Sequence, residues 1–222
     1  MPDNHYYGCC ACIGSAGAGL VPKMAVLKSG SGIVLNLYIS GTIKCETPSG
    51  NSVIIANETD YPRNGKIKIT VSLNAEEEFS IALRNPQWSK TTGVTVNGEI
   101  AEVQEGYIEI HRLWKDGDVV EMELDMRTEA IKPVPYGEQV LMNKVVWEHD
   151  YMVPNFDRED PLAKTHIALR RGPLMLAMDS RLGISPDIPV SIDIGNDGYV
   201  NALTPESDMA PYRHIVEVCI PT

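Results

Sequence analysis

The sequence predicts an all-β protein built from two antiparallel, jelly-roll-like β-sandwich units. Short segments alternate between apolar and polar residues, which is the period of a half-buried strand. Turn dipeptides such as Asn97-Gly98 and Asp116-Gly117 separate these segments at intervals of about ten residues. A helical period does not appear after residue 28. Frequent turns between short alternating strands are typical of an antiparallel sandwich.

The alternation is clearest in residues 25–130, which are predicted to form the first sandwich. Within 66–73 it places Ile67, Ile69, Val71 and Leu73 on one face. Residues 131–222 are less regular and are predicted to form the second sandwich, with strand-like segments around the turn at Arg171-Gly172. The predicted strands are 32–39, 52–56, 66–73, 78–84, 94–99, 107–110, 118–124, 167–170, 173–178, 190–194 and 215–220.

Residues 1–24 differ from the rest, because small residues are followed by an apolar stretch. Gly14, Gly17 and Gly19 would each cost a helix about 1 kcal/mol relative to alanine. The segment therefore predicts a short helix that packs against other helices.

Composition limits the classes of partner. The net charge is −11 without a cluster of Lys and Arg, so a nucleic-acid partner is not expected. Apolar runs stay well short of the roughly 20 residues that span a bilayer, so a membrane partner is not expected either. Five cysteines without regular spacing favour a reduced, cytoplasmic-type chain. Localisation stays open, because a fragment would lack the signal peptide of a periplasmic or secreted parent.

Three of the cysteines, Cys9, Cys10 and Cys12, lie within four positions. Such a dense group of thiols is typical of a metal site or a nucleophile. A structural zinc ion takes about four ligands, which three crowded cysteines do not easily supply. A small zinc or thiol protein is therefore the less favoured interpretation of this chain alone.

The three tryptophans, Trp88, Trp114 and Trp147, allow two interpretations. Aromatic faces can stack on sugar rings, which would suit an independent carbohydrate-binding module. Large aromatic side chains also dominate the packing between sheets, and we favour this second interpretation. The sequence does not assign substrate-binding residues.

Several segments together carry a family resemblance. They are Cys9-Cys10, the small-residue helix leading into 20–26, the strand 32–38, the segment Leu83-Arg84-Asn85-Pro86-Gln87-Trp88, the run 94–98 with Gly106-Tyr107, Trp114 and Gly117-Asp118, and Arg171-Gly172-Pro173-Leu174. They resemble the β-L-arabinofuranosidase-like glycoside hydrolases, family 127 and relatives. The resemblance covers nearly the whole chain but only the last part of the family architecture, an (α/α)6 barrel followed by two β-sandwiches.

This resemblance implies a division of the chain into a barrel remnant at 1–24, a first sandwich at 25–130 and a second at 131–222. The chain ends a little sooner than the final strands of the family, so an incomplete second sandwich is left open. We therefore expect the C-terminal accessory region of a glycoside hydrolase acting on plant-type glycans, inactive as the isolated chain. Whether the truncation is natural or a cloning choice is left open.

The resemblance also implies a retaining mechanism with a cysteine nucleophile in a zinc thiolate site. Carried over, Cys9 is the candidate nucleophile, while Cys10 and Cys12 are candidate zinc ligands. Which of the three matches the family pair stays open, since Cys12-Ile13 fits the same pattern. The remaining ligands, a glutamate and a cysteine, and the general acid are expected from the helical barrel, the implied partner. Zinc and a carbohydrate substrate are thus expected for the intact parent, and no cofactor for this chain alone.

Overall fold

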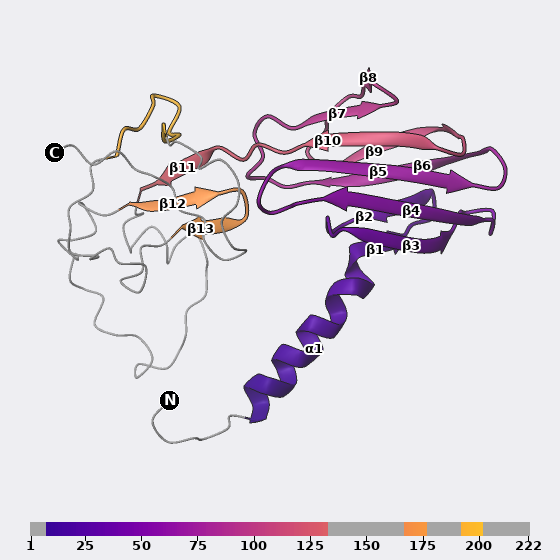
Figure 1. Cartoon of the computed structure of the whole chain (residues 1–222), viewed down its shortest axis with the longest axis horizontal. Helices are drawn as coiled ribbons and strands as arrows, with labels where there is room; N and C mark the ends of the chain where they lie inside the picture. The colour runs from indigo at the N-terminus through magenta and orange to yellow at the C-terminus, as the bar shows by residue number, and fades with distance from the viewer. Residues whose placement is uncertain (1–7, 133–166, 177–191, 202–222) are drawn as a thin grey trace. The chain divides into compact units, whose positions relative to one another are not determined.

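A computed structural model of the chain describes residues 8–132, 167–176 and 192–201, with side chains from residue 12 onward. The chain divides into two compact units, Met1–Met126 and Arg127–Thr222. Figure 1 shows the first unit as one helix and a set of strands, and the second as a smaller sheet. The predicted strand at 215–220 lies outside the described residues.

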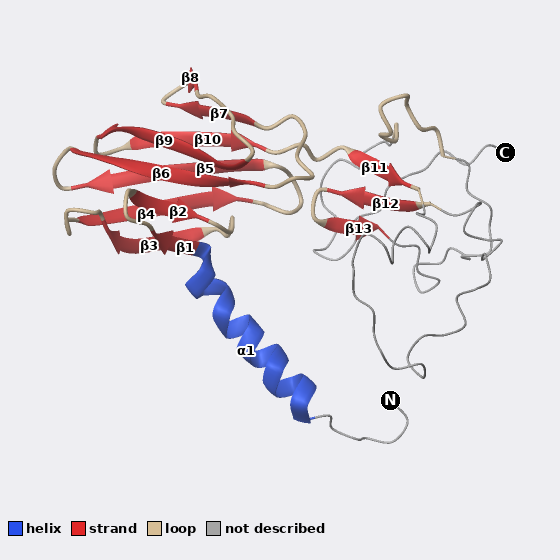
Figure 2. Cartoon of the chain, turned by 180° about the vertical axis from the view of Figure 1, so that it is seen from behind, coloured by secondary structure: helices blue, strands red, loops and turns tan. Residues whose placement is uncertain are grey.

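Two sheets make up most of the first unit (Figures 1 and 2). The four-stranded sheet has the order β1-β2-β6-β9, and the six-stranded sheet has the order β3-β4-β5-β10-β7-β8. The predicted all-β fold class is confirmed. The strands of the first sheet are β1 (Val26–Lys28), β2 (Gly32–Leu35), β6 (Glu77–Asn85) and β9 (Gly106–Trp114). Those of the second are β3 (Gly41–Glu46), β4 (Ser52–Thr59), β5 (Lys66–Leu73), β7 (Gly93–Val96), β8 (Glu99–Ile100) and β10 (Asp118–Glu123).

The core lies between these two sheets and follows the alternation in the sequence. Strand β5 buries Ile67, Ile69, Val71 and Leu73, the face that the pattern predicts. They join one cluster with residues of the other sheet, among them Phe79, Ile81, Leu83, Ile108 and Trp114. Each large side chain buried in this way contributes about 1.5–3 kcal/mol to the stability of the fold.

Strand β2 pairs with β6 in parallel, whereas the sequence predicts antiparallel pairing throughout. The register runs from Gly32 opposite Ser80 to Leu35 opposite Leu83. A parallel pair needs a crossover connection, and here β3, β4 and β5 of the other sheet provide it. Strands β2 and β6 approach closely at Gly32, where an added Cβ would lie 1.8 Å from the carbonyl oxygen of Ser80.

Several strand limits differ from the prediction for local reasons. The strand predicted at 32–39 ends at Leu35. The backbone N–H groups of Asn36 and Leu37 both donate to the carbonyl oxygen of Ala25, so they do not continue the strand pairing. The segment predicted at 94–99 is a hairpin, in which Asn97 and Gly98 turn the chain with φ of 51° and 84°. Strands β1, β3 and β11 (Thr128–Ile131) were not predicted. Of the strand predicted at 190–194, the described residues 192–194 form only an isolated bridge at Ile194.

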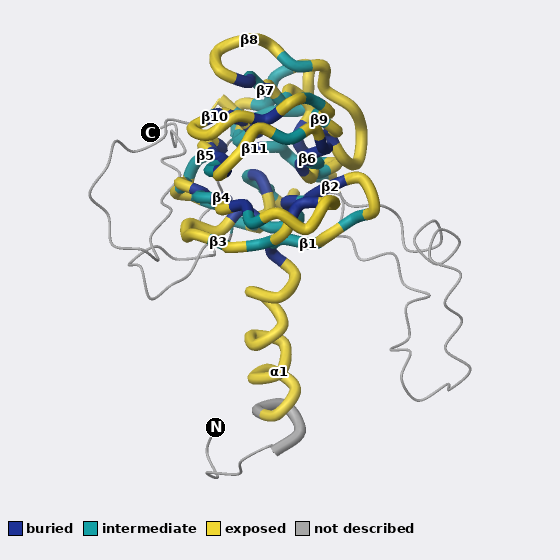
Figure 3. The backbone as a smooth tube through the Cα atoms, turned by 90° about the vertical axis from the view of Figure 1, so that its right-hand side faces the viewer, coloured by how far each residue is buried: buried dark blue, intermediate teal, exposed yellow. Residues whose placement is uncertain are grey.

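Helix α1 (Gly8–Ala25) occupies the segment predicted to be helical. Every residue from Cys12 to Met24 is exposed, and only Ala25 is buried (Figure 3). Strand β1 follows at once, so the helix enters the sandwich without an intervening loop. Within the described residues, none of the helices is long and apolar enough to cross a membrane.

The second unit contains a three-stranded antiparallel sheet of β11 (Thr128–Ile131), β12 (Ala168–Arg171) and β13 (Leu174–Leu176). Gly172, with φ of 56°, lies in the turn between β12 and β13. The guanidinium of Arg127 lies 3.7 Å from the ring centroid of Tyr199, and Arg170 pairs with Glu129 across β11 and β12.

Candidate functional site

The cysteine cluster lies in the first turns of helix α1, since Cys9, Cys10 and Cys12 all fall within Gly8–Ala25. Cys12 is an exposed free thiol. The side chains of Cys9 and Cys10 lie outside the described set, so their roles as nucleophile and zinc ligand stay predictions. In the described part of the chain, three or more His, Cys, Asp or Glu side chains are nowhere grouped to hold a metal ion.

Trp114 belongs to the core and not to a sugar-binding surface. It is 0% exposed, and its indole Nε1 donates a 2.9 Å hydrogen bond to the carbonyl oxygen of Phe79. The guanidinium of Arg112 lies 5.4 Å from the centroid of its ring. Trp88 is half-buried and packs against the same core, while Trp147 lies outside the described residues. The packing interpretation is thus confirmed for Trp114.

The end of helix α1 is joined to the sandwich by a small hydrogen-bonded group around Asn36. The backbone N–H of Asn36 donates to the carbonyl oxygen of Ala25 at 2.9 Å, and the side-chain Nδ2 of Asn36 donates to the carbonyl oxygen of Met24 at 3.0 Å. The hydroxyl of Tyr107 donates to Asn36 Oδ1 at 2.8 Å. The side chain of Asn36, which follows β2, therefore connects the helix that carries the cysteines to strand β9.

Two tyrosines, the buried Tyr38 after β2 and the half-buried Tyr61 after β4, pack against each other. The Tyr38 hydroxyl donates a 2.6 Å hydrogen bond to the carbonyl oxygen of Arg84, and its ring meets that of Tyr61 edge to face at 6.2 Å. Burial raises the pKa of both phenols, so each stays protonated and acts only as a neutral hydrogen-bonding group near pH 7. This geometry suits a structural role.

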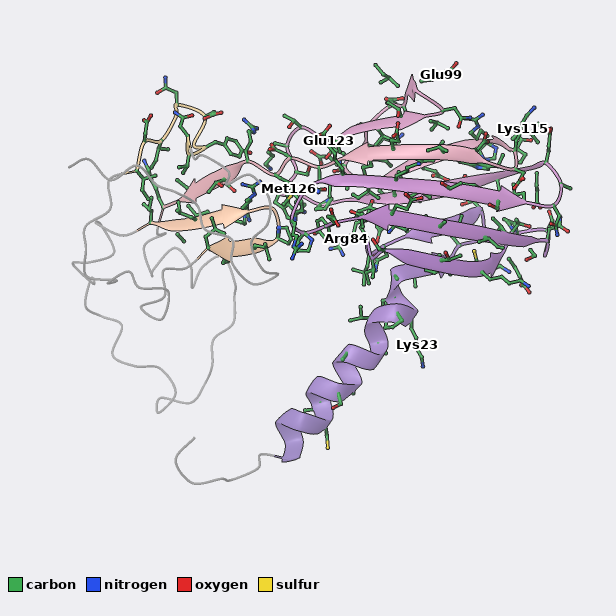
Figure 4. All side chains as sticks on the ribbon, in the orientation of Figure 1. Lys23, Arg84, Glu99, Lys115, Glu123 and Met126 are labelled. Atoms are coloured by element: carbon green, nitrogen blue, oxygen red, sulfur yellow. The ribbon has the colours of Figure 1, made fainter. Side chains whose placement is uncertain are left out.

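A broad groove of about 1,160 Å³ lies along the outer face of the six-stranded sheet. Its floor carries a row of alternating charges. In the strand register, Glu58 of β4 lies opposite Lys68 of β5, and Lys68 lies opposite Glu121 of β10. The neighbouring row has Lys66 opposite Glu123, which Figure 4 labels on β10. Smaller residues, Gly93, Thr95, Thr42 and Ala56 among them, also line the groove.

These charged groups remain available to a ligand. Among the residues that the structure describes, salt bridges within 4.0 Å join other pairs, such as Lys115 with Glu76, but not these five side chains. Carboxylates accept and ammonium groups donate hydrogen bonds, which is the pattern that a polyhydroxylated molecule needs. Sequence reasoning missed the groove, because it depends on which strands are neighbours. The available signal was the repeated charge at every second position of 66–68 and 121–123.

Comparison with protein families matches residues 32–126 to the model described as "Beta-L-arabinofuranosidase, GH127 middle domain". Comparison with the curated proteins found no match.

Among solved structures, the chain is similar to Ara127N-Se, a GH127 β-L-arabinofuranosidase from Geobacillus stearothermophilus T6, with 31% identity and a TM-score of 0.57. That match covers 75% of this chain and 24% of the other. A second structure, described as a glycoside hydrolase, has 25% identity and a TM-score of 0.59 over 76% of this chain and 25% of its own. A third, a GH127 β-arabinofuranosidase at 24% identity, shares the fold with a TM-score of 0.53 over 70% of this chain and 24% of its own.

The chain thus spans about a quarter of the length of the solved structures that it matches. The core strands from β2 to β10 fall inside the matched range, whereas the cysteine cluster precedes it. The predicted resemblance to family 127 glycoside hydrolases is confirmed, and residues 32–126 are similar to the middle domain of that family.

Proposed function

We propose that this chain supplies the C-terminal accessory β-sandwich region of a glycoside hydrolase resembling β-L-arabinofuranosidases, and that this region braces a helical catalytic barrel. The match of residues 32–126 to the GH127 middle domain supports the assignment to this enzyme class. Plant-type glycans are the proposed substrates of the intact enzyme. The isolated chain is proposed to be inactive, because the barrel is expected to supply the general acid and further ligands.

The observation that carries the proposal is the exposure of helix α1. Four large apolar side chains are exposed by 42–72%, namely Ile13, Leu20, Val21 and Met24. A helix that is apolar on all sides is normally buried. Its glycines and the internal Pro22 also weaken it in isolation. Neighbouring helices would remove both problems, as they would in the predicted (α/α)6 barrel.

The cysteines enter the proposal through this helix. Cys9 is the proposed nucleophile, with Cys10 and Cys12 as proposed zinc ligands in the intact enzyme. A glutamate and a further cysteine of the barrel would complete the set. A nucleophilic thiolate needs a lowered pKa, which a bound metal would supply.

Turnover of an aryl β-L-arabinofuranoside by the purified chain tests the proposed inactivity. We expect hydrolysis no faster than the buffer control. Turnover that Cys9→Ser and Cys10→Ser abolish would contradict the proposal, because it would place a complete active site in this chain.

Dye binding tests the proposed covering of α1. The full chain should enhance the fluorescence of a hydrophobic dye, and the variant Leu20→Gln/Val21→Gln/Met24→Gln should lose most of that signal. The matched control is Ile100→Gln, which changes a 90% exposed apolar residue on β8. Equal signals from the parent and the triple variant would count against an uncovered helix face.

A second candidate function is binding of a neutral oligosaccharide in the groove of the six-stranded sheet. The observation that favours it is the alternating row Glu58–Lys68–Glu121, whose charged groups lack ion-pair partners among the described residues. Titration against neutral oligosaccharides should give saturable binding, at least tenfold weaker in Lys68→Ala/Glu121→Gln. The control Lys115→Ala/Glu99→Gln makes the same charge changes outside the groove. Unsaturable binding, or equal binding by both variants, would reject this candidate.

A further inference from the structure

We infer that Asn36 is a positioning residue that fixes the direction of helix α1 relative to the sandwich, and thereby the location of the cysteine cluster. The geometric part of this inference stands on the hydrogen bonds described above. Its importance for catalysis rests on the proposed function.

The first observation is the direct junction of helix and strand. Helix α1 ends at Ala25 and β1 begins at Val26. The last four carbonyl groups of a helix lack partners within the helix. Here the Ala25 oxygen accepts from the N–H groups of Asn36 and Leu37 at 2.9 and 3.2 Å. The Met24 oxygen accepts from Asn36 Nδ2 at 3.0 Å. Residues after β2 thus satisfy two of these four carbonyl groups, those of Met24 and Ala25.

The second observation is the reach of the Asn36 side chain across the sheet. Its Oδ1 accepts from the hydroxyl of Tyr107, which lies on β9. In the order β1-β2-β6-β9, the strands β1 and β9 form opposite edges. One amide therefore links the helix end at one edge with a strand at the other. Its orientation is defined, because an amide oxygen facing the Met24 carbonyl would be repelled.

The third observation is the length of the helix beyond this point. Ala25 is the one buried residue among the described side chains of α1, so in this chain alone the junction at Ala25 determines the direction of the helix. At 1.5 Å per residue, a helix of this size is about 27 Å long. A tilt of about 10° at the base would move its first turn by about 5 Å. A displacement of about 1 Å can already slow an enzyme about a hundredfold.

Distances between two spin labels in the full chain test the inference. One nitroxide is placed on Cys12 and the other on Lys115→Cys, in a background with the other four cysteines changed to serine. Asn36→Asp keeps the acceptor for Tyr107 but places a carboxylate oxygen against the Met24 carbonyl. Tyr107→Phe removes only the hydrogen bond from the Tyr107 hydroxyl to Asn36 Oδ1. The control Asn64→Asp makes the same amide-to-carboxylate change but preserves the acceptor for the N–H of Lys66.

We expect a narrow distance distribution in the parent and in Asn64→Asp, a shift or broadening of several ångströms in Asn36→Asp, and a smaller one in Tyr107→Phe. Identical distributions in the parent and both junction variants would overturn the inference, as would a parent distribution already as broad as that of Asn36→Asp. If Asn36→Asp fails to fold, the milder Tyr107→Phe still decides. The measurement needs no enzymatic activity, so its result is independent of the proposed function.

Discussion

Trp114 Nε1 donates a 2.9 Å hydrogen bond to the carbonyl oxygen of Phe79, and the two side chains are 0% and 1% exposed. Their rings lie 6.1 Å apart between their centroids. The pair ties the end of β9 to the start of β6, where Glu77 lies opposite Trp114. This bond assigns Trp114 to the framework of the sandwich.

Trp114→Phe should lower the free energy of unfolding by about 2–4 kcal/mol. The change leaves a small cavity and deprives the Phe79 carbonyl of its side-chain partner. Urea unfolding followed by circular dichroism measures the effect. The half-buried Trp88 provides the control, and Trp88→Phe should cost less than half as much. Equal losses of unfolding free energy in the two variants would contradict the larger structural contribution of the buried Trp114.

Gly32→Ala should destabilise the fold by more than about 2 kcal/mol, because the new methyl group would overlap the carbonyl oxygen of Ser80 in the parallel pair. Gly93→Ala is the control, since nothing lies within 4 Å of an added Cβ there. Thermal unfolding of the two variants measures the difference. A Gly32→Ala variant as stable as Gly93→Ala would contradict the close approach of β2 and β6.

The exposed thiol of Cys12 should react with a maleimide at least ten times faster than that of Cys45. Cys45 packs against the core, and its burial raises the pKa of the thiol, which lowers the fraction of reactive thiolate at pH 7. Mass spectrometry of peptides after timed labelling measures both rates. Peptides from a urea-unfolded sample provide the reference, in which the difference should disappear.

Glu77 should make the stability of the fold depend on pH in the acid range. Burial disfavours its charged form, but hydrogen bonds from Asn51, Thr47 and Ser49 outweigh this effect and lower its pKa. Because the pKa is lower in the folded state, the stabilisation is present above the ordinary value of 4.5 and is lost as the pH falls through the lowered pKa.

Glu77→Gln should therefore be less stable than the parent near neutral pH, and the difference should shrink as the pH falls below 4.5. Unfolding midpoints measured across this range test the prediction. Glu99→Gln, which removes a carboxylate from the exposed strand β8, is measured in parallel as the control. A constant difference for Glu77→Gln would mean that its pKa is not lowered by folding.

The sequence predicts most reliably the strands whose alternation is complete and whose turns have strong signals. Strand β5 has four buried residues at every second position, and the turn at Asn97-Gly98 uses residues that adopt positive φ. Strand β3 was missed because it is an edge strand, with only Ile43 and Cys45 half-buried. An edge strand with little buried surface leaves a weak pattern in the sequence.

The parallel pairing of β2 and β6 could not be predicted, because it depends on contacts between distant segments and not on local periodicity. The groove has the same origin, since Lys68 and Glu121 become neighbours only through the pairing of β5 with β10. By contrast, the cysteine cluster is visible in the sequence as adjacent residues. Its chemistry depends on partners from elsewhere, so the sequence indicates candidate residues without a complete site.

The crossover between β2 and β6 also has a consequence for the order in which the chain folds. Gly32 and Ser80 are paired although they lie 48 residues apart along the chain. Closing so long a loop is slow compared with forming adjacent strands. The meander of β3, β4 and β5 should therefore form first, and the four-stranded sheet should assemble late. During synthesis, β2 would have to wait until β6 has left the ribosome before it finds its partner.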